Sequence, residues 1–202
     1  MTLKPFLEAD RIEAGCDEVG RGCLAGPVVA AAVILPADYS NKWINDSKLL
    51  GKKQREDLIE EIKEKALAWK IAEASVEEID QINILNASFL AMSRAVRGLK
   101  MLPDHLLIDG NRFKSDLTIP HTCVIKGDGK YASIAAASIL AKVHRDNFMA
   151  SLSLDFPHYS WETNVGYPTK AHRTGIEKFG DCIWHRKSFN LLKAQLELEL
   201  EE

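Results

Sequence analysis

The sequence predicts an α/β protein built around one mixed β-sheet with helices on its faces. Two apolar strand-like segments, 11–18 and 27–35, lie close together near the start of the chain. Later strand-like segments alternate with helix-like ones, an order typical of parallel strands covered by helices. We therefore expect an antiparallel start to the sheet followed by parallel strands, within a single domain spanning 1–202. The later strands are expected at 69–76, 105–108 and 121–125.

Four helices are expected to cover the sheet. The second has the clearest start, because Ser75 and Glu78 have the spacing of a capping box, and its apolar pattern breaks near 82–84. The third is rich in small residues, which favours close packing against the sheet. A polar, aromatic loop is expected at 159–168, and a helical tail at 188–202. The four covering helices are expected at 52–67, 75–99, 132–151 and 170–179.

Composition is that of an ordinary globular protein, without the marks of a membrane or secreted chain. Hydrophobic residues make up 46% and charged residues 27% of the sequence. No apolar run reaches the roughly 20 residues that span a bilayer, and Met1–Asp10 lacks the parts of a secretory signal. The four cysteines show no CxxC spacing, which favours free thiols in a reducing compartment over a zinc site. We expect a cytoplasmic monomer with no membrane contact.

The net charge of −3 conceals a basic region. Residues 1–110 hold 14 Lys and Arg against 18 Asp and Glu, whereas residues 111–193 hold 12 against 7. Residues 194–202 hold no base and four acids. The basic region is weak evidence for a nucleic-acid partner, but it means that the acidic total does not exclude one.

The most informative stretch places two adjacent carboxylates, Asp17-Glu18, beside Gly20-Arg21-Gly22. Glycines permit sharp turns and let another molecule approach the backbone, and with the arginine they suggest a phosphate-bearing ligand. Asp109 closes a later strand, Asp128 lies in a glycine loop and Asp146 lies in a helix. Two carboxylates about 4 Å apart repel by roughly 4 kcal/mol at an effective dielectric near 20. Convergence of these acids therefore calls for a divalent cation such as Mg²⁺ or Mn²⁺.

Each acid also has an ordinary structural interpretation. For Asp128 or Asp146 alone, a cap, turn or surface role is the better interpretation, whereas for Asp17-Glu18 beside the glycines it is the worse one. Adjacent residues of a strand point to opposite faces, so Asp17 and Glu18 share a site only if the strand ends or bulges there. Gly20 and Gly22 permit such an ending.

Taken together, the motifs resemble the type 2 ribonucleases H, and among them the bacterial ribonuclease HII family. They occur in the family's order and cover nearly the whole chain, which makes the series far more specific than a lone acid pair. The matching segments are 17–22, 25–33, 46–48, 108–110, 126–128, 133–146, 166–169 and 185–189.

The resemblance implies an RNase H-like fold and a metal-dependent endonuclease that cuts RNA in RNA·DNA hybrids. It also implies incision on the 5′ side of ribonucleotides embedded in duplex DNA, which leaves 3′-hydroxyl and 5′-phosphate ends. The implied cofactor is Mg²⁺ or Mn²⁺, with two ions during catalysis. The implied partners are RNA·DNA hybrid and ribonucleotide-containing duplex DNA.

Carried over residue by residue, the resemblance assigns metal and substrate contacts. The catalytic acids and metal ligands are expected to be Asp17, Glu18, Asp109 and Asp146, with Asp128 as a nearby alternative. Gly20, Arg21 and Gly22 are expected to read the ribose 2′-hydroxyl, the group that distinguishes RNA from DNA. Tyr167 is expected to pack on the following sugar, with a loop-anchoring role as its alternative. The other expected substrate contacts are Lys48, Ser138, Lys142 and Arg145.

Two other functions are compatible with parts of this pattern. An RNase H-like nuclease or resolvase acting on DNA alone has scattered acids on a similar sheet, but it has no need for Gly20-Arg21-Gly22. A non-catalytic module would bind RNA·DNA hybrid without cutting it. Cleavage of a duplex that contains one ribonucleotide distinguishes the three functions.

Overall fold

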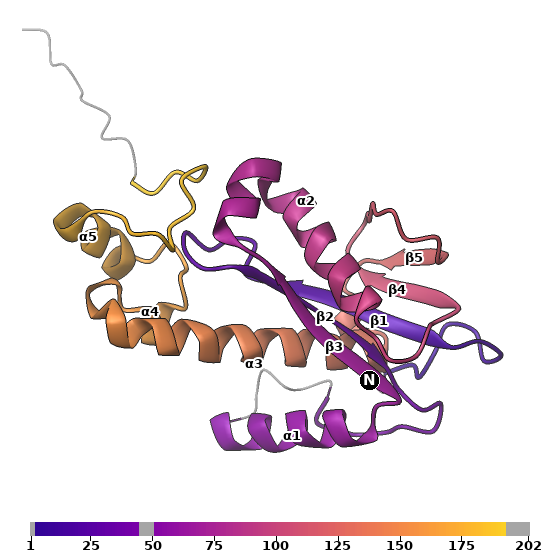
Figure 1. The fold of residues 1–202 in the computed structure, drawn as a ribbon. Coiled ribbons are helices and arrows are strands. Elements are labelled where there is room, and N and C mark those ends of the chain that lie inside the picture. The colour runs from indigo at the N-terminus through magenta and orange to yellow at the C-terminus, as the bar shows by residue number, and fades with distance from the viewer. Residues whose placement is uncertain (1–2, 45–50, 193–202) are drawn as a thin grey trace, which may run out of the picture.

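A five-stranded mixed sheet forms the centre of the molecule (Figure 1). The computed structural model describes residues 3–44 and 51–192. The strands lie in the order β3-β2-β1-β4-β5, with β1–β2 and β2–β3 antiparallel and β1–β4 and β4–β5 parallel. The predicted α/β class with an antiparallel start is therefore confirmed. The strands are β1 (Glu13–Val19), β2 (Val28–Ile34), β3 (Ala68–Ala74), β4 (His105–Asp109) and β5 (His121–Val124).

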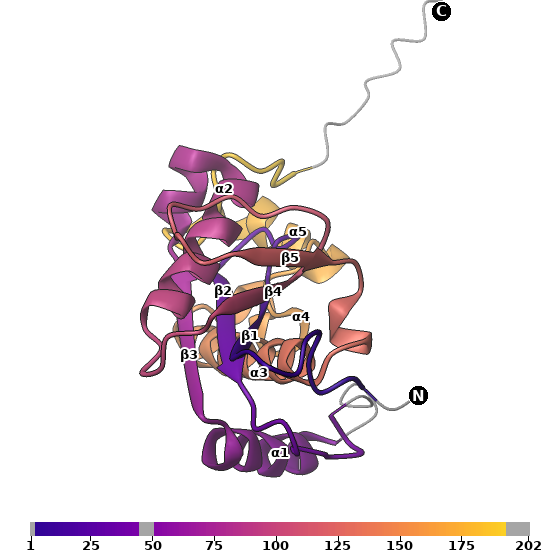
Figure 2. The same cartoon turned by 90° about the vertical axis from the view of Figure 1, so that its right-hand side faces the viewer.

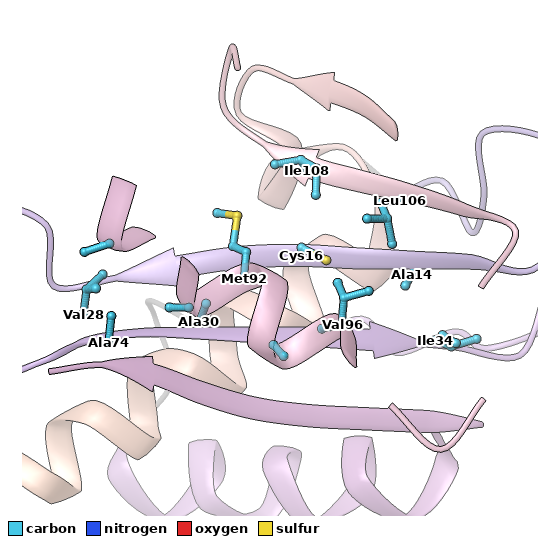
Figure 3. Packing of buried hydrophobic residues seen from close by; sticks show 14 of the residues in the cluster. Ala14, Cys16, Val28, Ala30, Ile34, Ala74, Met92, Val96, Leu106 and Ile108 are labelled. Carbon is cyan, nitrogen blue, oxygen red and sulfur yellow. The ribbon is translucent and has the colours of Figure 1, made fainter. Parts of the chain in front are cut away.

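Helix α2 covers one face of the sheet, and α3 and α1 lie on the other (Figures 1 and 2). On the α2 face, Met92 and Val96 pack with Cys16, Ala30 and Ile108 of the strands (Figure 3). None of the helices described is long and apolar enough to cross a membrane. The helices are α1 (Lys52–Lys65), α2 (Val76–Arg97), α3 (Ala132–Asp155), α4 (Trp161–Asn164) and α5 (Lys170–Phe179), with 3₁₀ turns η2 (Gly127–Gly129) and η3 (Pro157–Tyr159).

Two predictions about the C-terminal third need correction. The stretch 159–168 is not all loop, because α4 forms within it around the fully buried Trp161. One helical turn is too short to show periodicity in a sequence. The predicted tail helix does not begin at 188, since residues 188–192 are not helical. Its remainder, 193–202, lies outside the described residues.

The start and the break of α2 follow the predicted local chemistry. The Ser75 hydroxyl accepts from the Glu78 N–H, and the Glu78 carboxylate accepts from the Ser75 N–H, which completes the capping box. At Asn83 the backbone leaves the helical region, with φ 65° and ψ 162°. The Asn83 side chain accepts from the N–H groups of Leu85 and Asn86. The kink is therefore an internal cap that restarts the helix.

Close contact between β1 and α3 determines how the sheet meets its central helix. The small residues in the first half of α3 let it approach the strand, as the sequence predicts. The approach is tightest at Gly15, where a Cβ would lie 2.2 Å from the backbone carbonyl carbon of Ser133. Backbone atoms in a packed helix cannot shift as a side chain can, so this position admits no side chain at all.

Gly15→Ala is expected to destabilise the protein by about 3 kcal/mol or more, because the added methyl overlaps the α3 backbone. In a chain of this size that corresponds to a fall in Tm of roughly 6–12 °C. Thermal unfolding followed by circular dichroism measures the change. Gly129→Ala is the matched control, since no atom lies within 4 Å of its added Cβ. Equal Tm values for the two variants would contradict the close packing.

Candidate active site

Three of the predicted carboxylates come together where β1 and β4 end. The two strands run parallel with Cys16 opposite Ile108, so Asp17 and Asp109 are the next residues on neighbouring strands. The negative charge of Asp109 is close enough to raise the pKa of both Asp17 and Glu18. Strand β1 ends at Val19, directly after the acid pair. Both acids are still paired in register with β2, Asp17 with Ala31 and Glu18 with Ala30, so the expected end or bulge of the strand at the acid pair is not found.

Burial makes this cluster unfavourable for negative charge. It raises the pKa of Asp17 well above the usual range, and a hydrogen bond from the Ser138 hydroxyl opposes that rise. Burial also raises the pKa of Glu18, against the opposing effect of Arg21, whose Nη1 lies 3.1 Å from Glu18 Oε1. It raises the pKa of Asp109 as well, although the Gly127 N–H donates to this carboxylate at 2.6 Å.

The fourth acid of the cluster is Asp128 rather than Asp146. Asp128 lies in η2, where its charge and its backbone N–H both act on Asp109. Asp146 instead forms an ion pair with Lys142 at 2.9 Å, one turn away in α3. The negative charge of Asp146 contributes to the raised pKa values of Cys23 and Tyr167, so Asp146 lies near these two side chains. The structure thus favours the alternative that the sequence left open, because eight residues of helix separate Asp146 from Ser138 beside Asp17, about 12 Å along the axis.

The donor set of the cluster fits a hard divalent cation. All four groups supply carboxylate oxygens, and three of them are desolvated and repel one another, which a cation would relieve. As the described side chains stand, no three His, Cys, Asp or Glu groups are arranged to hold an ion. Protein partners engage them instead, such as Arg21 on Glu18 and Gly127 on Asp109.

Residues Gly20–Gly22, here called the glycine loop, follow the acid pair directly. Gly20 has φ 95°, and a Cβ there would lie 2.3 Å from Nε of Arg145. Both the conformation and the space require glycine at this position. A Cβ on Gly22 would meet Cε1 of the Tyr167 ring at 3.9 Å, so Tyr167 lies against the loop. The glycine loop therefore follows the acid pair in the chain and has Tyr167 against it.

Arg145, expected to contact substrate, lies buried against the glycine loop. Its side chain is fully buried, and it donates to the carbonyl oxygens of Pro27, Val165 and Ala25 at 3.0, 2.8 and 2.9 Å. An arginine with its donors directed at buried carbonyls has no exposed group to offer a phosphate. The sequence could not reveal this, because burial of a charged side chain depends on the tertiary fold.

Arg186 performs the same task from the C-terminal segment, and sequence reasoning assigned it no role. It is fully buried and donates to the carbonyl oxygens of Arg21, Gly26 and Pro27 at 2.8–3.2 Å. Burial, with the neighbouring Arg145 charge, lowers the pKa of Arg186 to about 10. Its place in the matched segment 185–189 was the one signal that pointed to it.

The remaining predicted substrate contacts have mixed outcomes. Ser138 is hydrogen-bonded to Asp17, so it orients an acid. Lys142 is partly exposed beside Asp146, and Arg21 is half exposed beside Glu18. Both cations are therefore accessible while they neutralise a carboxylate. Lys48 lies outside the described residues.

Comparison with known proteins identifies the family. The ribonuclease HII family model matches residues 14–192. Ribonuclease HII of Bacteroides fragilis is 63% identical over 197 residues, which cover 97% of this chain and 98% of that protein. The chain belongs to the ribonuclease HII family.

Solved structures related to the ribonuclease HII family share the fold at lower identity. Ribonuclease H2 from Pyrococcus horikoshii OT3 matches with a TM-score of 0.73 at 23% identity, over 89% of this chain and 94% of that one. Bst-RNase HIII in complex with Mn²⁺ matches with a TM-score of 0.69 at 18% identity, over 89% and 67%. The RNase H-like fold is thereby confirmed, and membership of the ribonuclease HII family confirms an endoribonuclease of the ribonuclease H type.

Asp17→Asn is expected to stabilise the metal-free protein at neutral pH while it abolishes cleavage. Because the folded-state pKa of Asp17 is raised, its carboxyl favours folding below the usual value of 3.8, and this contribution is lost as pH rises through the raised pKa. At about pH 7 the substitution removes a buried charge, and Tm should rise by roughly 3 °C or more, about 1 kcal/mol.

Thermal unfolding in EDTA across about pH 4 to 8 measures this effect. Glu64→Gln on the exposed side of α1 is the control and should leave Tm unchanged within about 1 °C. Added Mg²⁺ or Mn²⁺ should raise the Tm of the wild type but not that of the Asp17 variant. A lower Tm for Asp17→Asn in EDTA would contradict the electrostatic description of the cluster.

Proposed function

We propose that this chain is a metal-dependent endoribonuclease that hydrolyses RNA in RNA·DNA hybrids and incises 5′ of ribonucleotides embedded in duplex DNA. The products carry 3′-hydroxyl and 5′-phosphate ends, and the role is removal of misincorporated ribonucleotides in the cytoplasm by a monomer. The observation that carries the proposal is the placement of an acid cluster, a glycine loop and a half-exposed tyrosine side by side. The Mn²⁺ complex of Bst-RNase HIII supports the choice of cofactor.

The acid cluster supplies the chemistry. Asp17, Glu18, Asp109 and Asp128 would hold two Mg²⁺ or Mn²⁺ ions, which supply Lewis acidity toward the attacking water and the leaving 3′-oxygen. The protein's own part is orientation: Ser138 fixes Asp17, and Gly127 fixes Asp109. Arg21 lies close enough to neutralise Glu18 and moderates the repulsion within the cluster.

The glycine loop supplies the choice of cleavage position. With no side chains at Gly20 and Gly22, backbone groups can approach a ribose closely enough to hydrogen-bond the 2′-hydroxyl. Arg186 holds the Arg21 carbonyl inside this loop, and Arg145 and Arg186 hold the carbonyls of residues 25–27 just after it, which restricts the movement of the loop backbone. Tyr167 lies against Gly22, in a position to pack on the sugar that follows the ribonucleotide. A DNA-only nuclease needs none of these features.

Three labelled duplexes test the function: one with a single ribonucleotide, one all-DNA and one RNA·DNA hybrid. We expect the first and third to be cut in Mg²⁺ or Mn²⁺ and not in EDTA, with incision 5′ of the ribonucleotide. Asp109→Asn should lower cleavage by at least about 10³-fold while binding stays within about threefold. Equal cleavage of the all-DNA duplex would support the DNA nuclease instead, and binding without any cleavage by the wild type would support the binding module.

Asp128→Asn and Asp146→Asn distinguish the two candidates for the fourth acid. The Asp128 variant should lose at least about 100-fold in kcat/KM, because it removes a ligand beside Asp109. The Asp146 variant should lose less than about tenfold, since that carboxylate pairs with Lys142. Single-turnover cleavage of the one-ribonucleotide duplex measures both. The reverse order of the two losses would return the assignment to Asp146.

A further inference from the structure

Two buried histidines lie side by side behind Tyr167, and the chemistry proposed above uses neither. His172 in α5 is fully buried, and His185 in the segment after α5 is 1% exposed. Their Nε2 atoms lie 3.1 Å apart. A buried polar side chain persists only where its hydrogen bonds are made, so the partners of the two rings show what the pair holds together.

These partners assign one tautomer to each ring. The Cys182 backbone N–H donates to Nδ1 of His185 at 3.0 Å, so neutral His185 carries its proton on Nε2. The Trp161 indole N–H donates to Nε2 of His172 at 3.0 Å, so neutral His172 carries its proton on Nδ1. The single lone pair on His172 Nε2 is then shared between the Trp161 N–H and the Nε2–H of His185, and His172 Nδ1–H donates to the carbonyl oxygen of Tyr167 at 2.9 Å. We call this chain of bonds the histidine relay.

Burial keeps the histidine relay neutral. It lowers the pKa of His185 to about 4, and the neighbouring His172 contributes in the same direction. It also lowers the pKa of His172. A second proton on either ring would place a donor where Cys182 or Trp161 already donates. At neutral pH both rings therefore remain in the tautomers that complete the relay.

The histidine relay joins the Tyr167 loop to the segment that carries the glycine loop. On one side it ends at the main chain of Tyr167. On the other side, His185 forms an antiparallel bridge with Ala25, and the next residue, Arg186, donates to the carbonyl oxygen of Arg21 at 3.1 Å. The two elements proposed to contact the ribonucleotide are thus linked through buried side chains rather than through the substrate.

We propose that His172 and His185 are positioning residues that fix the Tyr167 ring against the glycine loop and so determine the preference for a single ribonucleotide over a continuous hybrid. The inference rests on the proposed function of that loop and of Tyr167. Tyr167 as a residue is 42% exposed, so its side chain has little packing of its own and its position depends on that of its main chain. A misplacement of about 1 Å can lower a rate 10²-fold. A continuous hybrid has no ribose-to-deoxyribose junction after the cleavage position, so its cleavage should depend less on the Tyr167 ring.

A double-mutant cycle tests the proposal. His172→Phe is measured alone and combined with Tyr167→Ala, on the one-ribonucleotide duplex and on the hybrid. Alone, it should lower kcat/KM on the one-ribonucleotide duplex by at least about tenfold, mainly through kcat, and on the hybrid by less than about threefold. In the Tyr167→Ala background it should change neither rate by more than about twofold. His185→Phe should behave in the same way.

Controls separate positioning from loss of folding. His105→Phe removes another buried histidine, whose Nε2 contacts the Thr122 hydroxyl at 2.8 Å on β4 and β5. In this variant the ratio of kcat/KM on the one-ribonucleotide duplex to kcat/KM on the hybrid should stay within about twofold of the wild-type ratio, whatever the Tm of the variant. If His172→Phe does not fold, His172→Gln serves in its place, with a smaller fall in the same ratio. All rates are taken at least about 10 °C below each Tm.

Two outcomes overturn the inference, and a third concerns the proposed function. Equal losses from His172→Phe in both Tyr167 backgrounds, or equal losses on both substrates, would show that the relay acts only through stability. If Tyr167→Ala itself leaves the substrate ratio unchanged, the proposed role of Tyr167 fails, and the relay has no ring to position. Cleavage of the hybrid by the wild type tests the proposed enzymatic function, independently of the roles of Tyr167 and of the histidine relay.

Discussion

The buried guanidinium groups of Arg145 and Arg186 are the constraint on which the rest of the site depends. Burying such a charge is unfavourable by several kcal/mol unless its donors are satisfied. Here backbone carbonyl oxygens accept from Nε, Nη1 and Nη2 of both side chains. Arg145 of α3 and Arg186 of the C-terminal segment both donate to the chain between β1 and β2, so these hydrogen bonds tie that chain to α3 and to the C-terminal segment. A rigid framework of this kind can hold a catalytic loop that contains almost no side chains of its own.

The acid cluster is the part of the molecule that works against folding. Burial and mutual repulsion raise the pKa values of Asp17, Glu18 and Asp109, so the folded metal-free protein carries an electrostatic penalty. Such a penalty is characteristic of a site whose groups are selected for chemistry rather than stability. The close packing of Gly15 on α3 and the apolar clusters on both faces of the sheet supply the stability that offsets it.

The sequence predicted the architecture well because local rules and the tertiary fold agree. Strands, helices, the Ser75 cap and the break near Asn83 all follow from short patterns. Where the outcome depends on a distant contact, the sequence was insufficient. The motif that ends in Arg145-Asp146 predicted a substrate contact and a metal ligand, yet Arg145 is buried among carbonyls and Asp146 pairs with Lys142. Only the fold shows that Asp128, in an unremarkable glycine turn, lies beside Asp109.

The selectivity proposed for this site requires rigidity more than it requires contacts. A site built to hydrogen-bond a hydroxyl can reject the analogue that lacks it by 10⁴–10⁵-fold, because buried polar groups are then left unpaired. That penalty exists only if the loop cannot relax to bond water or its own chain instead. The arginines remove this freedom from the main chain of the glycine loop, and the histidine relay removes it from the main chain of Tyr167. Arg186 and the histidine relay meet at residues 185–186, so under the proposed function a segment remote from the acids in sequence would control where they cut.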